Sequence, residues 1–295
     1  MFNRNNWDAP PRGAVVKAAT ATAKMRSPVP PFVRRAAVMG HHHVRFTAMM
    51  VKRAMGQPIM DQPSHSEREL ARGLTIILPG IEASGPYVQD MHDGLAAGNV
   101  QGSIQVFYWG RAFPEGYFPN LLDVRRNRTK GTELAQTILN HQNRFPKSPI
   151  HLIANSGGVG PALFAIEELP MDRPIDGLVI LAGAASNNYD LRGVLRRTRK
   201  GILNTYSQRD FVILNLGTRV FGTADRKFCV SCGHSGFVIP QQLKEDARLY
   251  NKLTQIKWNP EFGHRCDWWG NHGTSTSPKF MRFHIAPWIT ATCAS

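Results

Sequence analysis

Ser156 marks an abrupt change in the sequence, from the apolar segment 150–154 to the small residues Gly157 and Gly158. A helix-compatible segment follows at once, so the pattern is that of a strand, a tight turn and a helix. A serine at such a turn is exposed at the carboxyl end of its strand, and the free N–H groups of the helix behind it suit a developing oxyanion. The pattern therefore predicts a serine nucleophile at position 156.

A serine hydroxyl is a weak nucleophile at neutral pH, so this chemistry also needs an imidazole base and a carboxylate that orients the base. Asp210 lies in a short polar loop directly after the apolar segment 201–206 and is the predicted carboxylate. Asp190 and Asp225, in other loops, are the reserve candidates for this role.

Two histidines follow the last apolar segment, in the Gly-rich stretch 263–273. His272 lies between small residues and shortly before a predicted terminal helix, a position that suits a base reaching over the edge of a sheet. We therefore predict His272 as the base and keep His264 as the alternative.

The elements that must position these residues are strands separated by helix-length segments. The first strand, 74–78, is a continuous apolar run, as expected of a strand buried on both faces. Such spacing requires crossover connections, which indicates an α/β fold with a mainly parallel sheet and ligands beyond the carboxyl ends of its strands. The other predicted strands are 104–109, 150–154, 177–182, 201–206 and 253–258, and the predicted helices include 88–97 and 132–144.

The order of Ser156, Asp210 and His272, each after a later strand, resembles that of the α/β-hydrolase fold superfamily. The resemblance covers about residues 73–290, and the chain looks most like uncharacterised bacterial serine hydrolases of this superfamily. It implies a mainly parallel central sheet with helices on both faces and a Ser-His-Asp catalytic triad.

The loop after Pro79-Gly80 stands where members of this family carry an oxyanion loop. By the same resemblance, the backbone N–H groups of Ile81 and Gly157 would form the oxyanion hole, with Glu82 as the alternative to Ile81. The chain departs from the family pattern in two places. Ala154 replaces the usual first glycine of the serine turn, and the loop lacks the His-Gly pair that is common there.

Three cysteines and a histidine offer a second constellation. Cys229 and Cys232 form a Cys-x-x-Cys pair, and His264 and Cys266 follow about thirty residues later. Thiolates and imidazoles at such spacings can close a tetrahedral zinc site, but the second half is not another Cys-x-x-Cys. We expect no metal and no cofactor, and keep structural zinc as the weaker alternative.

The chain of 295 residues has a formal net charge of +15, and its leading segment carries about half of that excess. Residues 1–72 hold twelve Lys and Arg against four acidic residues, which gives 12 − 4 = +8. We expect a solvated, Pro-containing and largely disordered basic arm with a short helix over 45–55, followed by one domain over 73–295. We also expect the basic stretch 192–200 to be a solvated helix face.

No apolar run is long enough to cross a bilayer, and residues 1–24 contain no continuous apolar segment typical of a signal peptide. We therefore expect a cytoplasmic protein with no transmembrane segment. Binding to nucleic acid is not the expected role of the charge, because the basic stretches lack interleaved aromatic residues and Gly-rich loops.

Two functions compete on this evidence. The first is a serine hydrolase that cleaves a small-molecule ester, thioester or amide through an acyl-enzyme, with Trp268 and Trp269 walling the substrate pocket and residues 207–250 covering it. The second is a catalytically inactive scaffold of the same fold, whose basic arm binds nucleic acid or anionic lipid. Agreement among three separately placed loops favours the hydrolase.

Overall fold

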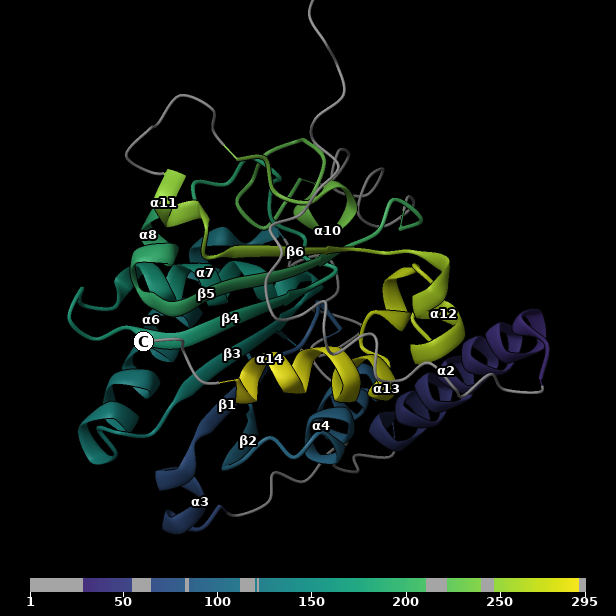
Figure 1. The fold of residues 1–295 in the computed structure, drawn as a ribbon, viewed down its shortest axis with the longest axis horizontal. Helices are drawn as coiled ribbons and strands as arrows, with labels where there is room; N and C mark the ends of the chain where they lie inside the picture. Colours follow the sequence, from purple (N-terminus) through teal and green to yellow (C-terminus); the bar gives the residue numbers. More distant parts are fainter. Residues whose placement is uncertain are drawn as a thin grey trace, which may run out of the picture.

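A computed structural model describes residues 29–54, 65–82, 85–111, 120, 122–210, 222–239 and 247–291 of the chain. Six strands form one parallel sheet in the order β2-β1-β3-β4-β5-β6 (Figure 1). This arrangement confirms the predicted α/β class and the parallel sheet.

The strands lie close to their predicted positions. β1 has the predicted bounds, whereas β2 ends three residues early, because the chain leaves the sheet after Val106. The six strands are β1 (Leu74–Leu78), β2 (Ser103–Val106), β3 (Ile150–Asn155), β4 (Ile175–Leu181), β5 (Thr198–Tyr206) and β6 (Leu253–Lys257).

The two faces of the sheet bury separate cores, because neighbouring residues of a strand point to opposite faces. One core contains Ile76, Leu152 and Leu178, and the other contains the residues that follow each of them, Ile77, Ile153 and Val179. This explains the continuous apolar runs in the central strands. Helices α6 (Val124–Arg144), α7 (Val159–Glu168) and α8 (Arg192–Arg196) cover the first face (Figure 1). The second face is covered by α4 (Pro86–Ala97) and the C-terminal helices α13 (Pro278–Phe280), η4 (Met281–Ile285) and α14 (Ala286–Thr290).

Most of the helices follow a strand in the chain. The larger helices are α2 (Pro31–Ala54), α4 (Pro86–Ala97), α6 (Val124–Arg144), α7 (Val159–Glu168) and α12 (Pro260–Cys266). The short ones are α3 (Glu67–Arg72), η1 (Ser156–Gly158), α8 (Arg192–Arg196), α10 (Cys232–Ser235), α11 (Ala247–Tyr250), η3 (His272–Thr274), α13 (Pro278–Phe280), η4 (Met281–Ile285) and α14 (Ala286–Thr290). None of the helices in the described ranges combines the length and the apolar character that crossing a membrane requires.

The helix of the N-terminal segment is longer than predicted. α2 begins at Pro31 rather than near residue 45, and proline is favourable in the first helical turn. Arg34 donates to Asp267, and Arg45 donates to Asp90 on α4, each at 2.5 Å. These pairs hold α2 against α4 and α12, where Figure 1 draws it in purple. Residues 1–28 and 55–64 lie outside the described residues.

The prediction of one helix face over residues 192–200 is wrong. α8 ends at Arg196, and β5 begins at Thr198. Arg199 then pairs with Asp176 on the neighbouring strand, and the Lys200 ammonium donates to the carbonyl oxygen of Ile289 at 2.6 Å. The two cations therefore contact different elements, β4 and α14, and do not share one helix face.

The direction of the strand order reverses between β1 and β3. The chain runs from β1 to β2 on one side and then crosses to β3 on the other side of β1. Open parallel sheets bind ligands at such a point, where the direction of strand order reverses. The loop after Leu78 and the turn at Ser156 both begin at the carboxyl ends of these strands.

Candidate active site

The turn at Ser156 has the backbone of a strained strand-to-helix junction. Ser156 has φ of +52°, a region that residues with a side chain rarely adopt. β3 ends at Asn155, η1 covers Ser156–Gly158, and α7 begins at Val159. The Ser156 carbonyl oxygen accepts from the Ala184 N–H at 3.0 Å, which fixes the turn against the loop after β4.

Two glycines after Ser156 are required by close approach of the β1 loop. A Cβ atom at Gly158 would lie 2.4 Å from the Pro79 carbonyl oxygen, and one at Gly157 would lie 2.5 Å from Cγ2 of Ile81. No side chain fits at either position without movement of that loop. The turn therefore lies directly against the loop in which the oxyanion donors are predicted.

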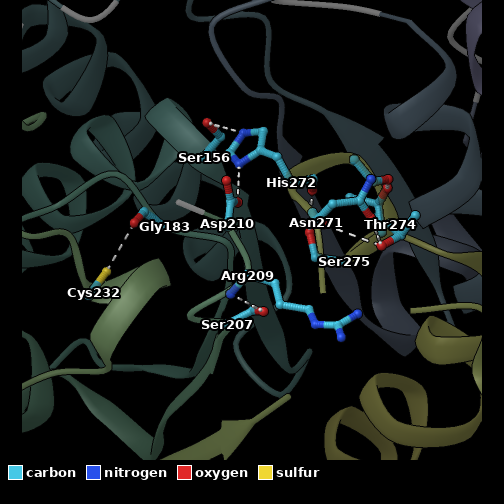
Figure 2. Close-up of polar contacts among 12 residues, drawn as sticks. Ser156, Gly183, Ser207, Arg209, Asp210, Cys232, Asn271, His272, Thr274 and Ser275 are labelled. Carbon is cyan, nitrogen blue, oxygen red and sulfur yellow. Dashed lines mark hydrogen bonds and ion pairs between the residues drawn. The ribbon is translucent and has the colours of Figure 1, made fainter. Parts of the chain in front are cut away.

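The side chains of Ser156, His272 and Asp210 lie in a continuous chain of hydrogen bonds. His272 Nε2 is 2.9 Å from Ser156 Oγ, and His272 Nδ1 is 2.6 Å from Asp210 Oδ2 (Figure 2). Because the carboxylate only accepts, Nδ1 carries the proton and Nε2 is free to accept from the serine hydroxyl. The structure thus brings together the three residues predicted from separate loops.

The loop that carries Asp210 is held by its own backbone. The Asp210 N–H donates to the Ser207 carbonyl oxygen at 3.1 Å, and the Arg209 N–H donates to Ser207 Oγ at 3.2 Å. The Ser207 N–H in turn donates to the Gly233 carbonyl oxygen at 2.9 Å. This turn directs the Asp210 carboxylate toward His272, whereas the Arg209 side chain points away from it (Figure 2).

The His272 loop is fixed by small polar residues around it. Thr274 Oγ1 accepts from the Trp269 N–H at 3.0 Å and donates to the Asn271 side chain, and Ser275 Oγ donates to the His272 carbonyl oxygen at 3.0 Å. A Cβ at Gly273 would lie 2.7 Å from the Tyr87 hydroxyl. The loop therefore packs closely on the first turn of α4, which limits the positions open to the imidazole.

The electrostatic surroundings favour the protonated form of His272. Burial lowers the pKa of His272, but the charge and hydrogen bond of Asp210 and the charge of Glu82 outweigh burial, so the pKa lies above its usual range. The His272 side chain keeps 18% of its surface exposed, whereas Ser156 keeps 4%. The partly buried ring presents Nδ1 to the carboxylate and Nε2 to the serine.

The loop after β1 is anchored by two side chains that sequence reasoning did not identify. The Trp109 indole N–H donates to the Pro79 carbonyl oxygen at 2.8 Å, and the Asn120 amide donates to the Ile81 carbonyl oxygen at 2.8 Å. Both fix the backbone on which the predicted oxyanion donor at Ile81 depends. Nothing in the sequence around Asn120 signals this role, because the residue comes from a segment remote from the loop.

The sequence predicts a role only for the backbone N–H of Glu82, but its side chain is a further feature of the site. The side chain is buried, with 8% exposed, and Oε1 has no hydrogen-bond partner among the described residues. Its charge interacts with His272. The sequence signal was a charged residue directly after a strand end and a Pro-Gly turn.

The alternative residues lie elsewhere. His264 is exposed on α12, where its ring contacts Trp269 and its carbonyl oxygen accepts from Arg34 at 2.6 Å. Asp190 pairs with Arg192 on the surface, and Asp225 accepts from the Ser186 N–H at 2.8 Å. Each has a local structural partner, whereas His272 contacts Ser156 directly and Asp210 contacts His272.

The four residues of the zinc alternative are not gathered into one site. Cys232 Sγ is buried and lies 3.4 Å from the Gly183 carbonyl oxygen, apart from the triad (Figure 2). Cys266 Sγ lies 3.4 Å from His284 Nε2 on the other face of the sheet, and burial raises the pKa of Cys266 to about 11. Within the described ranges, no group of three or more His, Cys, Asp or Glu side chains is placed to hold a metal ion.

The two tryptophans have different positions. Trp268 has 1% exposure, and its ring lies 4.5 Å from that of Phe280, so it belongs to the core. Trp269 lines a pocket of about 260 Å³ at the end of β6, together with Phe32, Arg35, Arg209, Trp258, Pro260 and His264. Much of the predicted cover, 211–221 and 240–246, lies outside the described residues.

Comparison with known proteins adds no family assignment, since neither the family models nor the curated proteins that were searched include a match to this chain.

Proposed function

We propose that the protein is a serine hydrolase of the α/β-hydrolase type, which cleaves a carboxylic ester, thioester or amide through an acyl-enzyme. The observation that carries this proposal is the chain of hydrogen bonds from Asp210 through His272 to Ser156. The positive φ of Ser156 supports it, because such strain at a strand-to-helix turn exposes a nucleophile.

The arrangement of the sheet supports the same proposal. Ser156 follows β3, Asp210 follows β5, and His272 comes after β6, so all three lie beyond the carboxyl ends of parallel strands. This is the chain order and the location of the triad in α/β hydrolases.

Acylation begins when the Ser156 hydroxyl attacks the substrate carbonyl carbon. The hydroxyl proton moves to His272 Nε2, and the Asp210 carboxylate stabilises the resulting imidazolium through Nδ1–H. The backbone N–H groups of Ile81 and Gly157 are the proposed donors to the oxyanion that forms on the carbonyl oxygen.

The intermediate then collapses and the leaving group departs. His272 returns its proton to the leaving oxygen, sulfur or nitrogen, and Ser156 remains acylated. A water molecule, deprotonated by His272, attacks the acyl carbon. The bond from this carbon to Ser156 Oγ then breaks, His272 returns the proton to Oγ, and the carboxylic acid is released. The raised pKa of His272 favours the protonated state that leaving-group departure requires.

Labelling with a fluorophosphonate probe tests the nucleophile. The wild type should be labelled on Ser156, and Ser156→Ala should not. His272→Ala should lose labelling, whereas His264→Ala is the matched control and should retain it, because His264 is exposed on α12. Equal labelling of the wild type and Ser156→Ala would refute the proposal.

The inactive-scaffold alternative assigns the activity to the basic N-terminal segment. Two of its cations, Arg34 and Arg45, already pair with Asp267 and Asp90 of this chain. Their charge is therefore partly used within the molecule. Salt-dependent binding of nucleic acid or anionic vesicles by a protein that no probe labels would support the scaffold.

A further inference from the structure

Glu82 presents an unusual carboxyl group beside the proposed reaction centre. Its side chain is more than nine-tenths buried, and Oε1 lacks a hydrogen-bond partner among the described residues. A buried carboxyl oxygen without a partner is costly, since burial removes its hydration without replacement. Oε1 of Glu82 therefore lacks the hydrogen-bond donor that a buried carboxyl oxygen requires.

The surroundings of Glu82 supply little positive charge. The chain has 36 Lys and Arg residues against 21 Asp and Glu, yet no described Lys or Arg forms an ion pair with Glu82. Burial raises the pKa of Glu82, although the backbone N–H groups of Glu82 and Gly80 and the charge of His272 oppose this effect. Among the described residues, the Glu82 carboxyl group thus has no Lys or Arg partner that would stabilise its charged form.

The loop that carries Glu82 lies against the serine turn. The preceding residue, Ile81, lies against Gly157, where Cγ2 would be 2.5 Å from an added Cβ. Glu82 Oε2 folds back over Gly80, 2.3 Å from the place of a Cβ there. The charge of the carboxyl group also interacts with that of His272.

We propose that Glu82 is a specificity residue, and that it selects substrates with an ammonium group within a few bonds of the scissile carbonyl. The inference rests on the proposed hydrolase function. An ammonium group donates up to three hydrogen bonds and carries a positive charge, which no described Lys or Arg supplies to Glu82. A neutral, isosteric substrate leaves Oε1 without a partner and is accepted less well.

During acylation, Asp210 and Glu82 then each offset one positive charge. During acylation His272 becomes an imidazolium beside Asp210, and a substrate ammonium would add a second positive charge nearby. Glu82 offsets that charge, so the cation of the substrate does not oppose protonation of the base. Without Glu82 the same substrate would destabilise the imidazolium.

Two pairs of isosteric esters test this inference. Alanine methyl ester and methyl isobutyrate differ by an ammonium in place of a methyl group on the acyl side. Acetylcholine and 3,3-dimethylbutyl acetate differ by a quaternary nitrogen in place of a carbon on the leaving-group side, so this pair tests charge without an N–H donor. For the wild type, the ratio of kcat/KM between cationic and neutral ester should be about 10 to 100 in at least one pair.

Glu82→Gln should bring that ratio down at least about tenfold, because the amide keeps the shape and removes the charge. Glu167→Gln is the matched control. Glu167 is a partly buried glutamate on α7 that accepts from the Tyr189 hydroxyl at 2.9 Å, and burial also raises its pKa. Its substitution should leave the ratio unchanged, and circular dichroism establishes that both variants are folded.

The outcomes separate the two proposals. Fluorophosphonate labelling of wild-type Ser156 with no cationic preference in either pair, or with a preference that Glu82→Gln retains, overturns the role of Glu82 and leaves the hydrolase intact. Absence of labelling in the wild type overturns both. Labelling with a preference lost only in Glu82→Gln supports both.

Discussion

The imidazole of His272 is hydrogen-bonded to Asp210, and the charges of Asp210 and Glu82 both raise its pKa. The base must be neutral to accept the Ser156 proton, so activity falls as the pH drops through this pKa. Removing the Glu82 charge should lower the pKa of His272. We therefore expect the acid limb of the kcat/KM profile of Glu82→Gln, measured with a neutral ester, to move to lower pH.

Glu167→Gln should leave the acid limb where it is in the wild type, because Glu167 lies on α7 and is not among the groups that shift the pKa of His272. A limb that stays fixed in Glu82→Gln, or that moves to higher pH, would contradict the electrostatic coupling.

Asp210→Asn tests the other carboxylate. The amide can reverse the tautomer of His272 by donating to Nδ1, which leaves Nε2 protonated and unable to accept from Ser156. We expect kcat to fall about 10⁴-fold, as in other Ser-His-Asp sites. Asp225→Asn is the control for loss of a carboxylate elsewhere, since Asp225 accepts from the Ser186 N–H and lies outside the triad. A loss of less than about tenfold in Asp210→Asn would argue against its assigned role.

At this scale the sequence predicted which residues would meet but not all that surrounds them. Ser156, Asp210 and His272 each follow a strand end, and parallel strands bring such ends to one edge. The environment of Glu82 could not be predicted, because burial of a side chain depends on the loops that fold over it. The contact of Asn120 with the Ile81 carbonyl oxygen likewise depends on tertiary packing alone.

Among the elements, the turn between β3 and α7 must pack against the end of β1. A Cβ at Gly158 would lie 2.4 Å from the Pro79 carbonyl oxygen and 2.7 Å from that of Leu78, and neither backbone atom can yield cheaply. We expect Gly158→Ala to lower the free energy of unfolding by about 1–3 kcal/mol, measured by urea denaturation.

Gly193→Ala is the matched comparison, because its nearest neighbour, Cγ of Glu167, would lie 3.5 Å away in ordinary contact. In helix α8 this change should be neutral or stabilising. Equal stabilities of the two variants would show that the β1 loop yields more readily than the close contact implies.

Elements were predicted best where apolar pattern alone determines them. β1 could be placed because all five of its residues are buried. α6 begins at Val124, earlier than predicted. Its first turns could not be predicted from an apolar pattern, because they are basic and polar and pack through contacts such as Arg128 over the Phe164 ring. The predicted helix face over 192–200 is wrong because its arginines are spaced as on a helix, whereas residues from Thr198 pair with β4 and form a strand.

At the scale of the whole molecule, part of the net charge of +15 holds the N-terminal helix α2 against the rest of the chain. α2 carries no acidic residue in its first turn, and Arg34 donates both to Asp267 and to the His264 carbonyl oxygen. The side chains of this pair keep only 15% and 13% exposure, so solvent screens it less than a surface pair.

Breaking that pair should release α2 from the domain. Hydrogen bonds between charged groups contribute about 1.5–3 kcal/mol, so Arg34→Ala should speed amide hydrogen exchange in α2 by about 10- to 100-fold. Arg35→Ala is the neighbouring control, since Arg35 is exposed and has no ion pair with a described residue. Because Asp267 also binds Lys279 at 2.8 Å, the double variant of Arg34 and Asp267 isolates the coupling. Additive effects would mean that apolar contact, and not this pair, holds the helix.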